Sequence, residues 1–190
     1  MIRLHRPTCP RPDRLTAGDY KHADNKAALI DASSGKCMYC EAYVRDTSFG
    51  DVEHIQPKGR YPELEFEWNN LGFVCQRCNN AKGTKYEDRM PYINPYSEDP
   101  NDSVVASGAY IFQRGGSERG ELTIIDIELN RTELLERRQE LLNRIQKAID
   151  KCFRTNEPLR SSLLSQLKEE AEAKKEFSFV VGARLALETF

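Results

Sequence analysis

The chain has 190 residues, of which 39% are hydrophobic and 31% are charged, and its formal net charge at pH 7 is −2. This composition is that of one globular domain with an appendage, and it excludes a disordered chain or several independent cores. The sequence has no apolar segment near the roughly 20 residues that a membrane span needs, and no apolar run that would mark a secretory signal near its start. We therefore expect a cytoplasmic protein with no membrane partner.

The N-terminal part of the chain is expected to divide into an arm and a helix. Residues 1–19 are rich in Pro and Arg, and the prolines argue against regular structure, so this arm is expected to lie over the surface or over a partner. From Tyr20 to about Ala32 the pattern predicts a short helix, which ends at Ser33, Ser34 and Gly35.

Residues 20–118 are expected to form the central unit. Between Cys37 and Lys85 the sequence shows short strand-like pieces, turn residues and one helix start, a pattern typical of small domains that depend on metal for part of their stability. Residues 88–118 are rich in Pro, Asn, Ser, Asp and Gly and predict loops around a hairpin, with strands at 104–105 and 110–112.

Residues 119–190 are expected to form a helical C-terminal region. Leucine and isoleucine recur at helical spacing from Asn130 to Phe153, and Asn130 with Glu133 resembles a capping pair. A second helix is predicted from Pro158 to about Lys175, and residues 177–187 are expected to fold back onto this pair. These helices are candidates for contact with a partner, although they can equally pack on the central unit.

The cysteines give the first chemical signal. Two Cys-x-x-Cys pairs, Cys37 with Cys40 and Cys75 with Cys78, can converge into one tetrahedral set of thiolates, which favours a structural Zn²⁺ ion. The alternative is a set of unrelated reduced thiols. Cys9 and Cys152 have no partner at ligand spacing and are interpreted as ordinary thiols.

The residues between and beside the two cysteine pairs narrow the interpretation. Glu53 directly precedes His54 in the run Val-Glu-His-Ile-Gln-Pro-Lys, and Trp68-Asn69-Asn70 and Cys78-Asn79-Asn80 follow. This combination resembles the HNH, or ββα-metal, nuclease family in the variety that carries a four-cysteine zinc site. The resemblance implies an α+β protein with a ββα-metal core and a helical C-terminal extension, in which His54, Asn70 and Asn79 are the three residues of the motif.

Softer features extend the resemblance over most of the chain. Together with the N-terminal arm, the run Leu129-Asn130-Arg131 before a helix with Arg137-Arg138 resembles the PtuB family of HNH subunits, which occurs in Septu-type antiphage defence and in some retrons. The resemblance implies that the chain works beside an ATPase subunit of the ABC or SMC-like (PtuA-like) type.

The chemistry of the individual residues supports a hydrolytic site. A neutral imidazole at His54 can act as general base on water, the alternatives being a zinc ligand or a core histidine. Glu53 and Asn79 offer hard oxygen ligands for a catalytic Mg²⁺ or Mn²⁺ ion, the alternatives being a surface acid and a helix cap. Asn70 is interpreted as orienting the His54 loop, with Asn69 as the competing position.

The nucleic-acid contacts are less specific. Lys58, Lys82 and Lys85 are candidates for phosphate contacts, with solvated lysine as the alternative. Trp68 is interpreted as a core residue, with base stacking as the alternative. DNA is the expected substrate, RNA such as tRNA is a second hypothesis, and a non-catalytic zinc module that binds nucleic acid or protein is a third.

Overall fold

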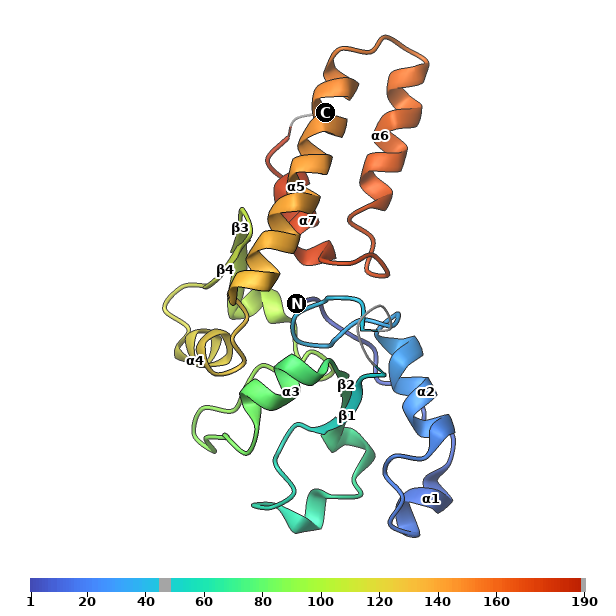
Figure 1. Ribbon diagram of the computed structural model, residues 1–190, viewed down its shortest axis with the longest axis vertical. Coiled ribbons are helices and arrows are strands. Elements are labelled where there is room, and N and C mark those ends of the chain that lie inside the picture. Colours follow the sequence, from blue (N-terminus) through green and yellow to red (C-terminus); the bar gives the residue numbers. More distant parts are fainter. Residues whose placement is uncertain (45–48, 189–190) are drawn as a thin grey trace.

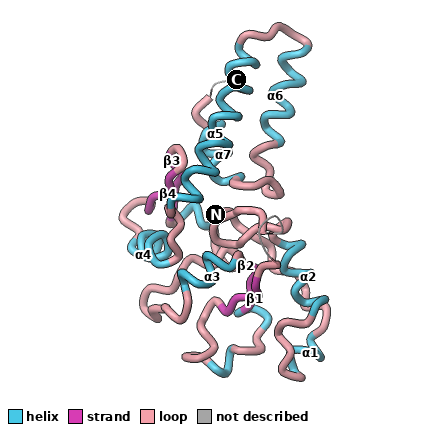
Figure 2. The backbone as a smooth tube through the Cα atoms, viewed as in Figure 1, coloured by secondary structure: helices cyan, strands magenta, loops and turns pink. Residues whose placement is uncertain are grey.

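The computed structural model describes residues 1–44 and 49–188, and its architecture is α+β, as predicted (Figure 1). In chain order the elements are α1 Pro12–Thr16, α2 Ala23–Ala32, β1 Asp51–His54, η1 Pro62–Leu64, η2 Trp68–Asn70, β2 Leu71–Val74, α3 Gln76–Lys82, η3 Pro100–Asp102, β3 Val104–Ser107, β4 Tyr110–Gln113, α4 Glu118–Asp126, α5 Thr132–Phe153, α6 Leu159–Glu169 and α7 Ser178–Leu185. Long loops connect the elements of the half that contains β1, β2 and α3 (Figure 2).

A ββα unit lies at the centre of that half. Strand β1 pairs antiparallel with β2, with Val52 opposite Phe73 and His54 opposite Leu71. Strand β2 is apolar and fully buried, and β1 carries polar side chains but is buried from Val52 to His54, so the hairpin is anchored in the core. Helix α3 follows β2 after one residue and packs against β1.

Helix α3 begins directly after Cys75. Cys75 is its N-cap, and the sulfur of Cys75 accepts the backbone N–H of Cys78. The alternative interpretation of Asn79 as a helix cap is therefore wrong, because Asn79 lies inside the helix. Lys82 is the last residue of α3, and Gly83 ends the helix at a φ of +53°.

The N-terminal arm packs into the core, and the prediction that it lacks regular structure is wrong. Pro12 begins helix α1, where a proline costs no helical hydrogen bond because the first N–H groups have no partner in any helix. Met1 and Leu4 are buried. The guanidinium of Arg6 donates to the carbonyl oxygens of residues 68, 69 and 71, and it stacks 3.8 Å from the ring centre of Tyr96.

The predicted hairpin at 104–112 is confirmed as β3 and β4, which pair with Val105 opposite Phe112. Helix α4 follows it, at the start of the region 119–190 that was expected to be helical. Gly120 lies in the first half of α4, and a Cβ atom there would come within 2.2 Å of the carbonyl oxygen of Ser103. Glycine is thus required at position 120 by the close packing of α4 against the chain at Ser103.

The C-terminal helices form an extension at one end of the molecule (Figure 1). Helix α5 forms as predicted, α6 packs against it, and α7 folds back onto α5 and β3. Two details differ from the prediction. Helix α6 ends at Glu169, and the side chain of Asn130 does not cap α5 but holds the backbone of Ile111 through two hydrogen bonds of 2.9 and 2.7 Å.

The segment that leads into α7 also holds the turn that carries Cys37 and Cys40. The backbone N–H of Tyr43 donates to Glu176 over 2.9 Å, and Ser178 donates to the buried carboxylate of Glu41 over 2.8 Å. Lys36 donates to the carbonyl oxygen of Lys175 over 2.9 Å. The extension is therefore fastened to the first cysteine pair. None of the helices in residues 1–44 and 49–188 has the length and apolar character needed to cross a bilayer.

Candidate active site and metal centre

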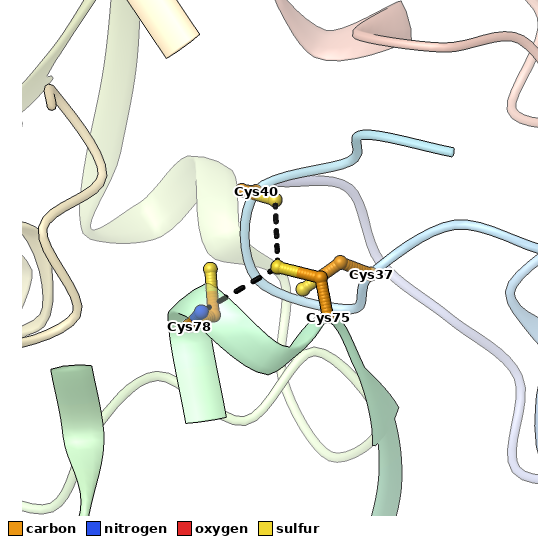
Figure 3. Close-up of side chains that lie close together, drawn as sticks. All are labelled: Cys37, Cys40, Cys75 and Cys78. Atoms are coloured by element: carbon orange, nitrogen blue, oxygen red, sulfur yellow. Dashed lines mark hydrogen bonds between the residues drawn. The ribbon is translucent and has the colours of Figure 1, made fainter. Parts of the chain in front are cut away.

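The four paired cysteines converge, as predicted. Cys37 and Cys40 lie on the turn after α2, and Cys75 and Cys78 lie at the start of α3 (Figure 3). All four are buried, and their sulfur atoms lie within 4.8 Å of one another. The sulfurs of Cys40 and Cys75 are 3.8 Å apart, which is close to the roughly 3.8 Å between sulfurs in a tetrahedral site with Zn–S bonds of about 2.3 Å. The donor set fits one closed, structural zinc ion.

His54 lies at the end of β1 with its imidazole held on one side. Its Nε2 lies 2.9 Å from the carbonyl oxygen of Glu65, and the ring packs edge-on against Tyr20 with a centroid separation of 4.6 Å. A carbonyl oxygen can only accept, so Nε2 carries the proton and Nδ1 keeps its lone pair. Burial lowers the pKa of His54, and the nearby charge of Lys58 lowers it further, while the Glu65 carbonyl opposes the shift. The imidazole is therefore neutral near pH 7.

The side chain of Asn70 holds the backbone of two segments near His54. Its Oδ1 accepts the N–H of Gln56 over 2.8 Å, and its Nδ2 donates to the carbonyl oxygens of Gln56 and Leu64 over 3.0 and 3.1 Å. Asn70 is buried, whereas Asn69 is exposed. These bonds fix the loop that follows His54 and the segment that supplies the Glu65 carbonyl.

Glu53 is buried beside a lysine from α3. The ammonium of Lys82 lies 2.5 Å from Oε1 of Glu53 and donates to the carbonyl oxygen of His54 over 2.9 Å. Oε1 has this ion pair but no hydrogen bond of good geometry within the described part of the chain. Burial raises the pKa of Glu53, Lys82 opposes this effect, and the charge of Asp51 adds to it.

Asn79 faces the same strand from one turn earlier on α3. Its Nδ2 donates to Oδ2 of Asp51 over 2.9 Å. Residues 51 and 53 lie on one face of β1 because side chains alternate along a strand, and residues 79 and 82 lie on one side of α3 because they are three apart. The two contacts therefore join the same faces of β1 and α3, and they place Asp51, Glu53 and Asn79 together.

Comparison with known proteins identifies this unit. Residues 37–85 match the family described as HNH endonuclease. These residues contain both cysteine pairs, His54, Asn70 and Asn79. Residues 37–85 form an HNH endonuclease domain.

Two relatives match beyond the HNH domain. Septu protein PtuB of Bacillus thuringiensis is 32% identical over 148 residues, which cover 71% of this chain and 57% of that protein. Septu protein PtuB of Bacillus mycoides (strain KBAB4) is 27% identical over an alignment of 202 residues. This alignment covers 90% of this chain and 68% of that protein. The chain thus spans little more than half of the first relative.

The lysines of the HNH domain differ in their surroundings. Lys58 and Lys85 are exposed, Lys58 in an ion pair with Glu65 at 2.7 Å and Lys85 beside Asp126. Lys82 is fully buried, and its burial removes it from any surface that a phosphate contacts. Trp68 is half-buried, and its indole N–H donates to the carbonyl oxygen of Pro7 over 2.8 Å.

Two residues of the site were not predicted from the sequence. Asp51 directly precedes the Val-Glu-His run, but its contact with Asn79 depends on the packing of α3 on β1. Arg131, at the N-cap of α5, places its guanidinium 3.5 Å from the sulfur of Cys78, 3.9 Å from that of Cys75 and 4.0 Å from that of Cys40. A cation at this position offsets the negative charge of four thiolates around one Zn²⁺ ion.

Proposed function

We propose that this chain is a metal-dependent endonuclease that hydrolyses phosphodiester bonds of DNA. The observation that carries the proposal is the state of His54, a neutral imidazole whose Nε2 is engaged by the Glu65 carbonyl and whose Nδ1 keeps its lone pair. Glu53 precedes His54 on β1, and Asn79 lies on α3, which packs against β1.

His54 supplies the base for the attacking water. Nδ1 takes a proton from the water as the water oxygen bonds to phosphorus, and the bond from phosphorus to the leaving sugar oxygen breaks. The Glu65 carbonyl then stabilises the imidazolium through its bond to Nε2, and the three bonds of Asn70 keep this carbonyl in place. A second water protonates the leaving sugar oxygen, and the imidazolium then releases its proton to the solvent.

Glu53 and Asn79 have side chains that can serve as ligands of a divalent ion. The Glu53 carboxylate and the Asn79 amide oxygen are hard donors, and two protein ligands leave positions for water and phosphate oxygens, as Mg²⁺ or Mn²⁺ prefers. When bound, such an ion supplies charge stabilisation for the phosphate and for the leaving oxygen. Lys82 holds the Glu53 carboxylate and the His54 carbonyl in a fixed relation, so the ligand and the base are oriented by one ammonium.

We further propose that the nuclease serves an antiphage defence system and that it works with an ATPase subunit of the ABC or SMC-like type. The similarity to Septu proteins PtuB over most of the chain supports this role. The α5–α6 pair, which extends away from the HNH domain, is the proposed contact with the ATPase (Figure 1). Co-purification from cells that express both subunits tests the partner, and deletion of residues 154–170 should abolish it.

The test of the activity compares wild type with His54→Ala, each with the same zinc content, on plasmid DNA and on total RNA with Mg²⁺ or Mn²⁺, alone and with the ATPase. We expect His54→Ala to lower the cleavage rate by a factor of about 10²–10⁴. His5→Ala is the matched control, because His5 is an exposed histidine of the arm. Equal rates for wild type and His54→Ala would reject the nuclease, and cleavage of RNA alone would reject DNA as the substrate.

A further inference from the structure

We infer that Asp51 is a positioning residue that turns the amide of Asn79 so that its oxygen, and not its nitrogen, faces the metal site. This inference rests on the proposed function, since it assigns the residue that prepares one of the proposed ligands.

Asp51 contacts the nitrogen end of the Asn79 side-chain amide. Oδ2 of Asp51 accepts the Nδ2–H of Asn79 over 2.9 Å, and this is the hydrogen bond that the Asn79 side chain makes within the described residues. Asp51 and Glu53 share a face of β1, and Asn79 reaches this face from α3. The carboxylate thus contacts the amide at the edge of the proposed site.

The chemistry of the two groups decides the orientation. An ionised carboxylate has acceptors and no donor, whereas an asparagine amide has a donor end and an acceptor end. Only the NH₂ end of Asn79 can therefore face Asp51, and Oδ1 points the opposite way. A divalent ion binds the oxygen of an amide and not its NH₂ group, so a freely rotating amide would present the wrong end in part of the population.

The position of Asn79 makes this orientation necessary. Its backbone is fixed by the helical bonds of α3, with the N–H of Asn79 donating to Cys75 over 3.0 Å and its carbonyl accepting from Gly83 over 2.8 Å. These bonds hold the Cα atom but leave the terminal amide free to turn. Asp51 supplies the missing constraint, and because it is partly exposed, its removal does not open the core.

The experiment measures Mn²⁺ binding by calorimetry on zinc-loaded protein, with the unfolding temperature of each variant as a check on the fold. The variants are Asp51→Ala, Asp51→Asn, Asn79→Ala and the double variant Asp51→Ala/Asn79→Ala. We expect Asp51→Ala to weaken Mn²⁺ binding by about 10–100-fold, the range for partners of metal ligands. Asp51→Asn keeps an oxygen acceptor and should weaken binding less. In the Asn79→Ala background, Asp51→Ala should have no further effect.

The outcomes separate the inference from the proposed function. Absence of Mn²⁺ binding to wild type would overturn the proposed metal site, and the inference with it. Binding to wild type and equal binding to Asp51→Ala would overturn the inference alone. A loss that is as large in the Asn79→Ala background, and as large for Asp51→Asn, would make Asp51 a direct ligand and overturn its positioning role.

Discussion

The ammonium of Lys82 lies 2.5 Å from the carboxylate of Glu53, and the two side chains are 0% and 7% exposed. The pair joins the end of α3 to the end of β1, where His54 follows Glu53. A buried ion pair adds little to stability as a whole, but removal of one partner leaves the other charge buried without compensation. The residue proposed to bind the catalytic metal is therefore also part of the fold.

We predict that Glu53→Gln destabilises the protein by about 3–5 kcal/mol, because the Lys82 ammonium is left without its partner. The double variant Glu53→Gln/Lys82→Met should recover most of this loss, since it removes both charges. Urea unfolding of the three proteins at equal zinc content measures the effect. A Glu53→Gln variant as stable as wild type would show that the pair carries no structural role.

A change of Lys82 should make stability depend on pH. Burial already raises the pKa of Glu53 and Lys82 opposes this effect, so Lys82→Met raises the pKa of Glu53 further. A carboxyl whose folded pKa exceeds its unfolded value, about 4.3, stabilises the fold at low pH and loses this contribution as pH rises through the folded pKa. Lys82→Met should thus lose more stability than wild type as pH rises above about 4.3, measured by unfolding without Mg²⁺. Parallel curves would contradict the prediction.

The adjacent asparagines offer a matched pair. Asn70→Ala removes three hydrogen bonds beneath the His54 loop and leaves partly buried backbone groups unpaired, which should cost about 1–3 kcal/mol and reduce cleavage. Asn69→Ala changes an exposed side chain and should leave both quantities near wild type. Thermal unfolding and a plasmid cleavage assay provide the measurements. If Asn69→Ala were the more damaging change, Asn69 and not Asn70 would be the residue of the motif.

Arg131 should slow the loss of zinc from the four cysteines. Arg131→Met removes the cation that lies near three of the sulfurs, and we expect zinc affinity to fall by about tenfold or more. Transfer of zinc to a coloured chelator measures this effect. Arg77→Met is the control, because the guanidinium of Arg77 pairs with Glu133 instead. The same transfer rate in both variants would dismiss the role of Arg131.

Removal of zinc should loosen the C-terminal segment as well as the cysteine turns. The turn with Cys37 and Cys40 is bound by Lys175, Glu176 and Ser178, so loss of its metal should release these bonds. Hydrogen exchange after chelation should increase in residues 36–44 and also in residues 174–181. An increase in exchange that is confined to residues 36–44 would indicate that residues 174–181 keep their structure when the cysteine turn loses its metal.

Local patterns predicted the zinc cysteines and α5 correctly. Paired cysteines two residues apart and leucines at helical spacing each report on structure within a few turns of chain, and the geometry of a thiolate site or an amphipathic helix follows from that spacing. The hairpin at 104–112 was predicted for the same reason.

Contacts between distant segments were beyond such patterns. Position 120 in α4 is a glycine because a Cβ atom there would meet the Ser103 carbonyl, and Asn130 holds Ile111 instead of capping α5. Lys82 was predicted to contact phosphate at the surface, but the packing of α3 on β1 buries it. Asp51 gains its contact with Asn79 in the same way, through the packing of α3 against the strand.

Helix α5 begins beside the cysteine sulfurs and has 22 residues, which at 1.5 Å per residue gives about 33 Å of rigid reach. A protein bound to α6 stands at the far end of the long axis from β1 (Figure 1). The two ends can thus be occupied at once without competition. The proposed contact on the helical extension therefore leaves the proposed active site open to substrate.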